Sequence, residues 1–219
     1  VNAASKLASS GVVGIVGGYC SGATLPTLQI FGDANLPMII AAANSTQLIP
    51  ANPGNAFMIN STGNDQAAKA IEFFGGRGIE SIAIVNQGDA YSQDLANLMR
   101  DQWEAAGHSV AAFEVTNKGE QDYSAIVTSI RAANPDAVFW TAYYADGGLL
   151  IRQLREGGFQ GLIAVGDGSN SPELFAIAGP AAEGVIGFST RPPSSCPAPR
   201  RSAKPTRPSS ARRQGPIRP

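Results

Sequence analysis

Short apolar runs alternate with amphipathic segments through residues 1–190 of this 219-residue chain. Runs of roughly four to eight apolar residues bounded by glycine, proline or asparagine are typical of buried strands, and apolar positions three or four residues apart are typical of helices. The runs predict strands at 12–18, 38–43, 56–60, 81–86, 109–115, 137–141, 162–165 and 184–189. The spaced pattern predicts helices at 22–33, 65–74, 92–106, 122–133, 147–156 and 173–178, and residues 1–10 match the end of another helix.

This alternation of strands and helices, with short connections, predicts the fold class. It is typical of α/β proteins built on doubly wound parallel sheets. Ligands of such sheets bind beyond the carboxyl ends of the strands. The residues that directly follow each predicted strand are therefore the candidates for function.

Residues 191–219 differ from the rest of the chain in composition. They hold eight of the 16 Lys and Arg residues, eight of the 15 prolines and no Asp or Glu, so the net charge of −1 combines an acidic body with a basic tail. A disordered basic arm has this composition. GC-rich DNA translated out of frame also gives Arg, Pro, Ala, Ser and Gly, and reading the segment in a shifted frame recovers apolar residues at helical spacing. We therefore predict a frameshifted tail, with a genuine basic arm or an expression scar as alternatives.

The residue types exclude several classes of function. The two cysteines and the single histidine form no zinc-ligand spacing and no evident catalytic pair. His108 follows Ala-Ala-Gly at a helix end and is expected to be exposed, whereas Cys20 is either a buried thiol or half of a disulfide. Neither a dinucleotide-binding glycine motif nor a phosphate-binding loop motif is present. The acidic body argues against a nucleic-acid partner, and the apolar runs are too short to span a membrane. We predict no cofactor, no metal and no enzymatic activity.

Two loops after the first predicted strands carry anion-binding chemistry. Ser21 stands at the N-cap position before the helix 22–33, where a hydroxyl, free backbone amides and the helix dipole favour an anion. An ordinary helix cap would explain the same residue. Ala42 and Asn44 lie at the end of the second strand and just after it, and they offer exposed backbone and a short polar side chain, which a simple turn would also explain.

Three later strand ends carry aromatic and acidic residues. Tyr91 and Tyr143 lie on loops after strands, where aromatic side chains are typical of pocket walls but also pack on neighbouring loops. Asp167 lies between two glycines, where a carboxylate either forms a turn or pairs with an ammonium group.

Five segments together resemble a known family. They are GVVGIVGGYCSGATLPTLQIF at 11–31, LPMIIAAANSTQL at 36–48, the stretch 79–107, the stretch 119–159 and AEGVIGFST at 182–190. In this order they resemble the branched-chain amino-acid-binding proteins of bacterial ABC importers, which have the type I periplasmic binding fold. The resemblance covers essentially all of residues 1–190.

The resemblance implies roles for individual residues. Ser21 would bind the ligand α-carboxylate, with Ala42 and Asn44 as backbone and side-chain partners; the family usually has Thr or Ser at the position of Asn44. Asp167 would pair with the α-ammonium, and Tyr91 and Tyr143 would be aromatic walls. Cys20 resembles a cysteine that pairs with an upstream one in some relatives.

The resemblance also implies an organisation and a function. Residues 1–60 would be part of lobe one, 61–190 lobe two and 191–219 the tail, with a hinged cleft between the lobes and further elements missing upstream and downstream. The chain would capture an aliphatic amino acid, or a similar small zwitterion or amide, for an ABC permease in the membrane. The full-length protein would be a monomer, either periplasmic or an extracellular membrane-anchored lipoprotein. The alternative is a ligand-sensing domain of the same fold in a signalling or regulatory protein.

Overall fold

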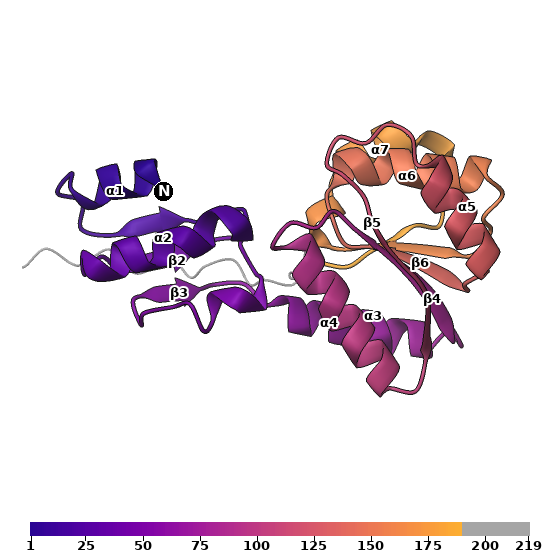
Figure 1. Cartoon of the computed structure of the whole chain (residues 1–219), viewed down its shortest axis with the longest axis horizontal. Coiled ribbons are helices and arrows are strands. Elements are labelled where there is room, and N and C mark those ends of the chain that lie inside the picture. The colour runs from indigo at the N-terminus through magenta and orange to yellow at the C-terminus, as the bar shows by residue number, and fades with distance from the viewer. Residues whose placement is uncertain (190–219) are drawn as a thin grey trace, which may run out of the picture.

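The computed structural model describes residues 1–189, so the predicted frameshifted tail lies outside the described residues. The described part is an α/β protein with two separate parallel sheets (Figure 1). The small sheet contains β1 (Ile15–Gly17), β2 (Met38–Ile40) and β3 (Ala56–Met58) in that order. The large sheet has the order β5-β4-β6-β7-β8, formed by β5 (Ser109–Val115), β4 (Ser81–Asn86), β6 (Ala137–Trp140), β7 (Leu162–Val165) and β8 (Ile186–Gly187). The α/β fold class predicted from the alternation is confirmed.

Helices cover one face of the small sheet and both faces of the large sheet (Figure 1). The small sheet carries α1 (Asn2–Ala8) and α2 (Ser21–Asp33). One face of the large sheet packs on α3 (Gly63–Gly75) and α4 (Ser92–Ala105), and the other on α5 (Ser124–Ala133), α6 (Tyr144–Glu156) and α7 (Pro172–Ala178). Three short 3-10 helices complete the described part, namely η1 (Thr46–Leu48), η2 (Asp167–Ser169) and η3 (Gly179–Ala182).

Strand β4 shows why the central strands of the large sheet are buried on both faces. Successive side chains of a strand point to opposite faces. Ile82 and Ile84 therefore join the cluster under α3 and α4, whereas Ala83 and Val85 join the cluster under α5, α6 and α7. All four are fully buried, which explains the continuous apolar run that the sequence shows at this strand.

Several predicted boundaries differ from the structure. Helix α6 begins at Tyr144 rather than at 147, and its Gly147 and Gly148 lie inside the helix. Both glycines make close contacts, because a Cβ on Gly147 would lie 2.6 Å from the Trp140 ring nitrogen and one on Gly148 would lie 2.7 Å from Ile177. The prediction of an exposed His108 is also wrong, since its ring stacks on Trp103 with centroids 4.1 Å apart and contacts Glu80 at 2.9 Å.

Candidate functional site

A small cavity of about 80 Å³ lies between the carboxyl ends of the two sheets. It is lined from the small-sheet side by Tyr19, Ala42 and Asn44 and from the large-sheet side by Tyr91, Tyr143, Asp167 and Gly168. Pockets for drug-sized ligands have volumes of roughly 300–1,000 Å³. In this arrangement of the two sheets, the cavity is therefore smaller than such a pocket.

Asp167 is the polar centre of this cavity. It is half-buried on η2, directly after β7. Its carboxylate accepts a hydrogen bond from Asn44 Nδ2 at 2.9 Å and one from the Tyr91 hydroxyl at 2.5 Å. Asn44 follows β2 and Tyr91 precedes α4, so this carboxylate joins groups from both sheets. Within residues 1–189, Asp167 forms no ion pair with a cationic side chain.

Tyr91 is held as a hydrogen-bond donor to Asp167. It is the N-cap of α4 and only 7% exposed. Burial and the nearby charge of Asp167 raise the pKa of the Tyr91 phenol well above its usual value, so the hydroxyl remains a donor even at a pH where a free phenol ionises. The Gly168 amide also donates to this hydroxyl oxygen at 2.9 Å. A Cβ on Gly168 would lie 2.8 Å from the Tyr91 ring, so this close approach requires glycine.

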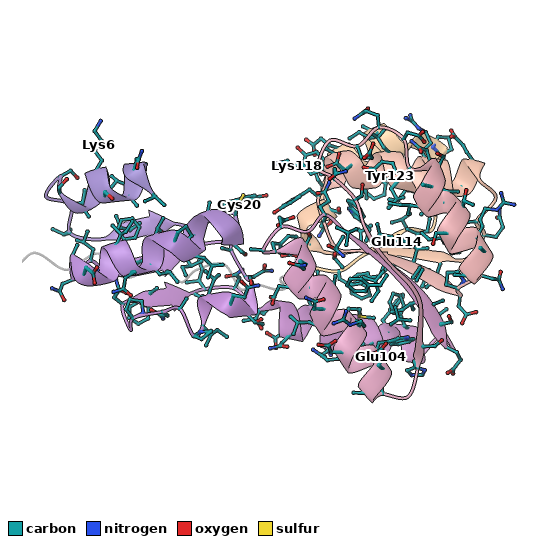
Figure 2. The ribbon with its side chains drawn as sticks, in the orientation of Figure 1. Lys6, Cys20, Glu104, Glu114, Lys118 and Tyr123 are labelled. Atoms are coloured by element: carbon teal, nitrogen blue, oxygen red, sulfur yellow. The ribbon has the colours of Figure 1, made fainter. Side chains whose placement is uncertain are left out.

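Tyr143 forms a second aromatic wall. Its ring centroid lies 5.5 Å from that of Tyr91, with the two rings tilted by 44°. Its hydroxyl donates to Asp89 at 3.2 Å, and burial followed by the charge of Asp89 raises the pKa of its phenol. Lys118 lies over the outer part of this wall, with its ammonium 5.9 Å from the ring centroid. The elements from α1 to β3 form the small-sheet unit, and those from α3 to β8 form the large-sheet unit. Figure 2 shows Lys118 on the side of the large-sheet unit that faces the small-sheet unit.

Ser21 is the predicted site residue that does not line the cavity. It is 1% exposed, and it is the first residue of α2 rather than its N-cap, which is Cys20. The Ser21 hydroxyl oxygen accepts a hydrogen bond from the Ser45 amide at 3.2 Å, next to Asn44. A hydroxyl has one O–H donor besides its lone pairs. Ser21 therefore keeps a donor beside the cavity, although the prediction that it caps α2 is wrong.

The remaining predicted residues surround the cavity. Ala42 uses its amide to donate to the Gly18 carbonyl at 3.1 Å, and its own carbonyl accepts from Asn60 Nδ2 at 2.7 Å. Tyr19 and Gly168 also line the cavity, although sequence reasoning did not select them. Both follow strands directly, so the rule that selected Asp167 applies to them too.

The described residues contain neither a metal site nor a membrane span. No group of three or more His, Cys, Asp or Glu side chains is placed to hold a metal ion in residues 1–189. No helix in that range is long and apolar enough to cross a bilayer.

Comparisons with known proteins identify the family of this chain. The family model described as "Periplasmic binding protein" matches residues 1–205. A Leu/Ile/Val-binding protein homologue of Brucella melitensis is 30% identical over 85% of this chain and 50% of its own length. A leucine-, isoleucine-, valine-, threonine- and alanine-binding protein of Pseudomonas aeruginosa is 29% identical over the same shares. The chain thus spans about half the length of these relatives.

Solved structures give the same result for the fold. A leucine-binding protein of Thermotoga maritima superimposes with a TM-score of 0.83 at 28% identity, over 90% of this chain and 57% of that one. A type 1 periplasmic binding protein of Bordetella pertussis shares the fold with a TM-score of 0.75 at 20% identity. The matched relatives are binding proteins rather than enzymes. The chain belongs to the periplasmic binding protein family, among relatives of the branched-chain amino-acid-binding type, and its two parallel sheets are a part of the type I fold.

Proposed function

We propose that this chain is the binding part of a solute receptor that captures a small aliphatic amino acid for an ABC importer. The observation that carries the proposal is the carboxylate of Asp167, which faces a cavity between two units and has only neutral hydrogen-bond donors within residues 1–189. A half-buried carboxylate without a cation is stabilised when an ammonium group binds to it. The α-ammonium of an amino acid supplies that charge.

The opposite end of the ligand would bind at the start of α2. The first amides of a helix have no partner inside the helix and attract an anion. The amides of Ser21 and Gly22 form no hydrogen bond to any other described residue, and the Ser21 hydroxyl keeps its donor. We place the ligand α-carboxylate here, with Ala42 and Asn44 beside it and with Tyr91 and Tyr143 as walls.

The two sheets would belong to two lobes that meet around the ligand. We propose a division near residue 60, in the connection between β3 and α3, with closure of the lobes when ligand contacts form on both sides. The relatives' names support branched-chain and other small aliphatic amino acids as the ligand class. The receptor would not be an enzyme, would work as a monomer outside the cytoplasmic membrane, and would deliver its ligand to a permease there.

Replacing Asp167 with Asn tests the proposal. The variant keeps the size of the side chain but removes the negative charge, so we expect leucine to bind at least ~10-fold more weakly, the size of a lost charge-assisted hydrogen bond. Titration calorimetry measures the affinity. Asp101→Asn is the matched control, because Asp101 is exposed on α4 and lies ten residues after Tyr91, almost three helical turns along the helix.

A second ligand sharpens the experiment. 4-Methylpentanoate has the carbon skeleton and carboxylate of leucine but no ammonium, so Asp167→Asn should leave its affinity unchanged or improve it. Leucine affinity that is equal in the variant and the unmodified chain would remove Asp167 from the site. Separately, thermal-shift screening of the unmodified chain against the common amino acids and simple amides would identify the preferred ligand.

A further inference from the structure

Residues 44–46 connect the two units at several points. The Asn44 side chain donates to Asp167, and the Asn44 carbonyl accepts from the Gly63 amide at 3.1 Å. The Ser45 amide donates to Ser21 within the small-sheet unit. Thr46 then donates twice to Asp94 of α4, from its amide to Oδ2 and from its hydroxyl to Oδ1, each at 2.7 Å. Three consecutive residues are thus bound alternately to the large-sheet unit and to their own unit.

Asp94 is an unusual residue for a surface helix. It is only 9% exposed and lies in the first turn of α4, three residues after Tyr91. It forms no ion pair with any cationic side chain in the described part of the chain. A buried carboxylate is costly unless its oxygens are bonded. Both oxygens are satisfied by Thr46, and the positive end of the helix dipole adds to this stabilisation.

The pair joins the two halves of the cavity. Asp94 is on the same helical turn as Tyr91, and Thr46 is two residues from Asn44, so each partner is close to a cavity residue of its own unit. We propose that Asp94 and Thr46 are positioning residues, which fix the strand-end loop of the small sheet against α4 and set the spacing across the cavity. The pair lies beside the Asn44–Gly63 hydrogen bond, at the end of the connection between the units, so this role applies to the open and the closed arrangement of the lobes and does not require a ligand. Only the expected change in ligand affinity rests on the proposed function.

The first experiment measures the relative position of the two units without any amino acid. Spin labels at Lys6→Cys on α1 and Glu104→Cys on α4, both exposed and labelled in Figure 2, report the distance between the units. Cys20→Ser and Cys196→Ser remove the native thiols. We expect a narrow distance distribution for the otherwise unmodified chain, and a clearly broader or shifted one for Thr46→Val and for Asp94→Asn. Because the two residues act as one pair, the double variant should differ little from the worse single variant.

Two controls separate positioning from a loss of folding. Thr46→Ser keeps the hydroxyl and should retain the narrow distribution, and Asp101→Asn removes a charge from the same helix without touching the pair. Both tryptophans, Trp103 and Trp140, are buried in the large-sheet unit, so their fluorescence during unfolding reports on that unit alone. An unchanged midpoint with a broadened distribution supports the proposal. Unchanged distributions in Thr46→Val and Asp94→Asn, or broadening that occurs only with a lower midpoint, would overturn it.

Leucine affinity provides the second arm. Apparent affinity falls in proportion to the fraction of molecules in the binding-competent arrangement, so a reduction of that fraction to about one fifth weakens binding about five-fold. We expect this effect in Thr46→Val and recovery in Thr46→Ser. If neither the unmodified chain nor any variant binds leucine, the proposed function fails. The distance measurements still decide the role of the pair. Equal leucine affinity in Thr46→Val and Thr46→Ser would contradict a positioning role at the site.

Discussion

The two sheets follow the same pattern of strands and helices but differ in how completely they are covered. The large sheet is covered on both faces, and the strands β4 and β6 are almost wholly buried. Within residues 1–189, the small sheet has helices on one face only. Its other face presents Val16, Ile39 and Phe57, which are 77%, 41% and 59% exposed and are paired side by side in the strand register.

This difference shows that an apolar strand sequence does not by itself determine whether both faces of the strand are buried. Each strand of the small sheet has an inner side chain in the core, such as Met38 or Ile40, and an outer one that is apolar as well. Apolar residues on both faces are typical of parallel sheets that are covered twice. The small sheet therefore has the composition of a doubly covered sheet with one face open in the described residues.

The strongest test of the comparison replaces one phenylalanine in each sheet region. Phe74 is fully buried on α3 and makes edge contacts with Trp103 and Phe139, so Phe74→Ala should lower the free energy of unfolding of the large-sheet unit by about 3–5 kcal/mol. Phe57→Ala in the open face should change stability by less than about 0.5 kcal/mol. Urea unfolding followed by tryptophan fluorescence and circular dichroism measures both. Similar losses in the two variants would mean that the open face of the small sheet is packed in solution.

A smaller effect is expected from alkaline pH on the large-sheet unit. The pKa of the Tyr91 phenol is raised in the folded chain. Below about pH 10, the ordinary tyrosine pKa, the phenol is therefore protonated in both the folded and the unfolded state. Above that pH the unfolded state loses the proton first, and Tyr91 should lower stability by about 1.4 kcal/mol for each further pH unit until its folded pKa is reached. Tyr91→Phe should remove this part of the slope in urea midpoints measured between pH 8 and 11.5.

Tyr19→Phe is the matched control for that experiment, because Tyr19 lines the same cavity but is 76% exposed. Tyr143 and Tyr123 also have raised phenol pKa values, so some alkaline slope should persist in Tyr91→Phe. An identical slope before and after the Tyr91→Phe change would show that the phenol is not held in the protonated form by the fold.

The sequence predicted β4, β5 and β7 well because turn residues such as Gly88, Gly107 and Gly166 bound these strands. The bounds 81–86, 109–115 and 162–165 agree with β4, β5 and β7. The small sheet was predicted less well, because the apolar run 38–43 continues past β2 into a turn. There the amides of Ala42 and Ala43 donate to the Gly18 carbonyl instead of extending the strand.

Helix α6 shows the opposite error. The sequence predicts a helix from Gly147 after a loop over 142–146, whereas the helix begins at Tyr144 and includes Gly147 and Gly148. They lie within it because the ring of Trp140 and the side chain of Ile177 occupy the space of their missing side chains. This is a tertiary requirement that no local pattern contains.

The cavity could be located from the sequence only in outline. Because parallel strands end at the same edge of a sheet, residues after strands could be expected to converge, and Ala42, Asn44, Tyr91, Tyr143 and Asp167 do line one cavity. Their pairing could not be predicted. Asn44 and Asp167 are 123 residues apart and Thr46 and Asp94 are 48 apart, and both pairs depend on how the two units sit against each other.

The smallest effect on stability is expected when an exposed phenylalanine of either unit is replaced. Phe57 and Phe175 are similarly exposed, at 59% and 55%, but Phe57 lies in a row with two other apolar side chains whereas Phe175 is on α7 of the large-sheet unit. Contiguous apolar patches bind hydrophobic dyes and promote association, and single exposed residues do so much less. Phe57→Ser should therefore reduce the fluorescence of bound anilinonaphthalene sulfonate several-fold and raise solubility, with almost no change in the unfolding midpoint. Phe175→Ser should leave dye binding nearly constant. Equal reductions in the two variants would mean that exposure of a single ring, rather than the open face of the small sheet, governs the dye signal. The difference in coverage between the two sheets would then have no effect on dye binding in solution.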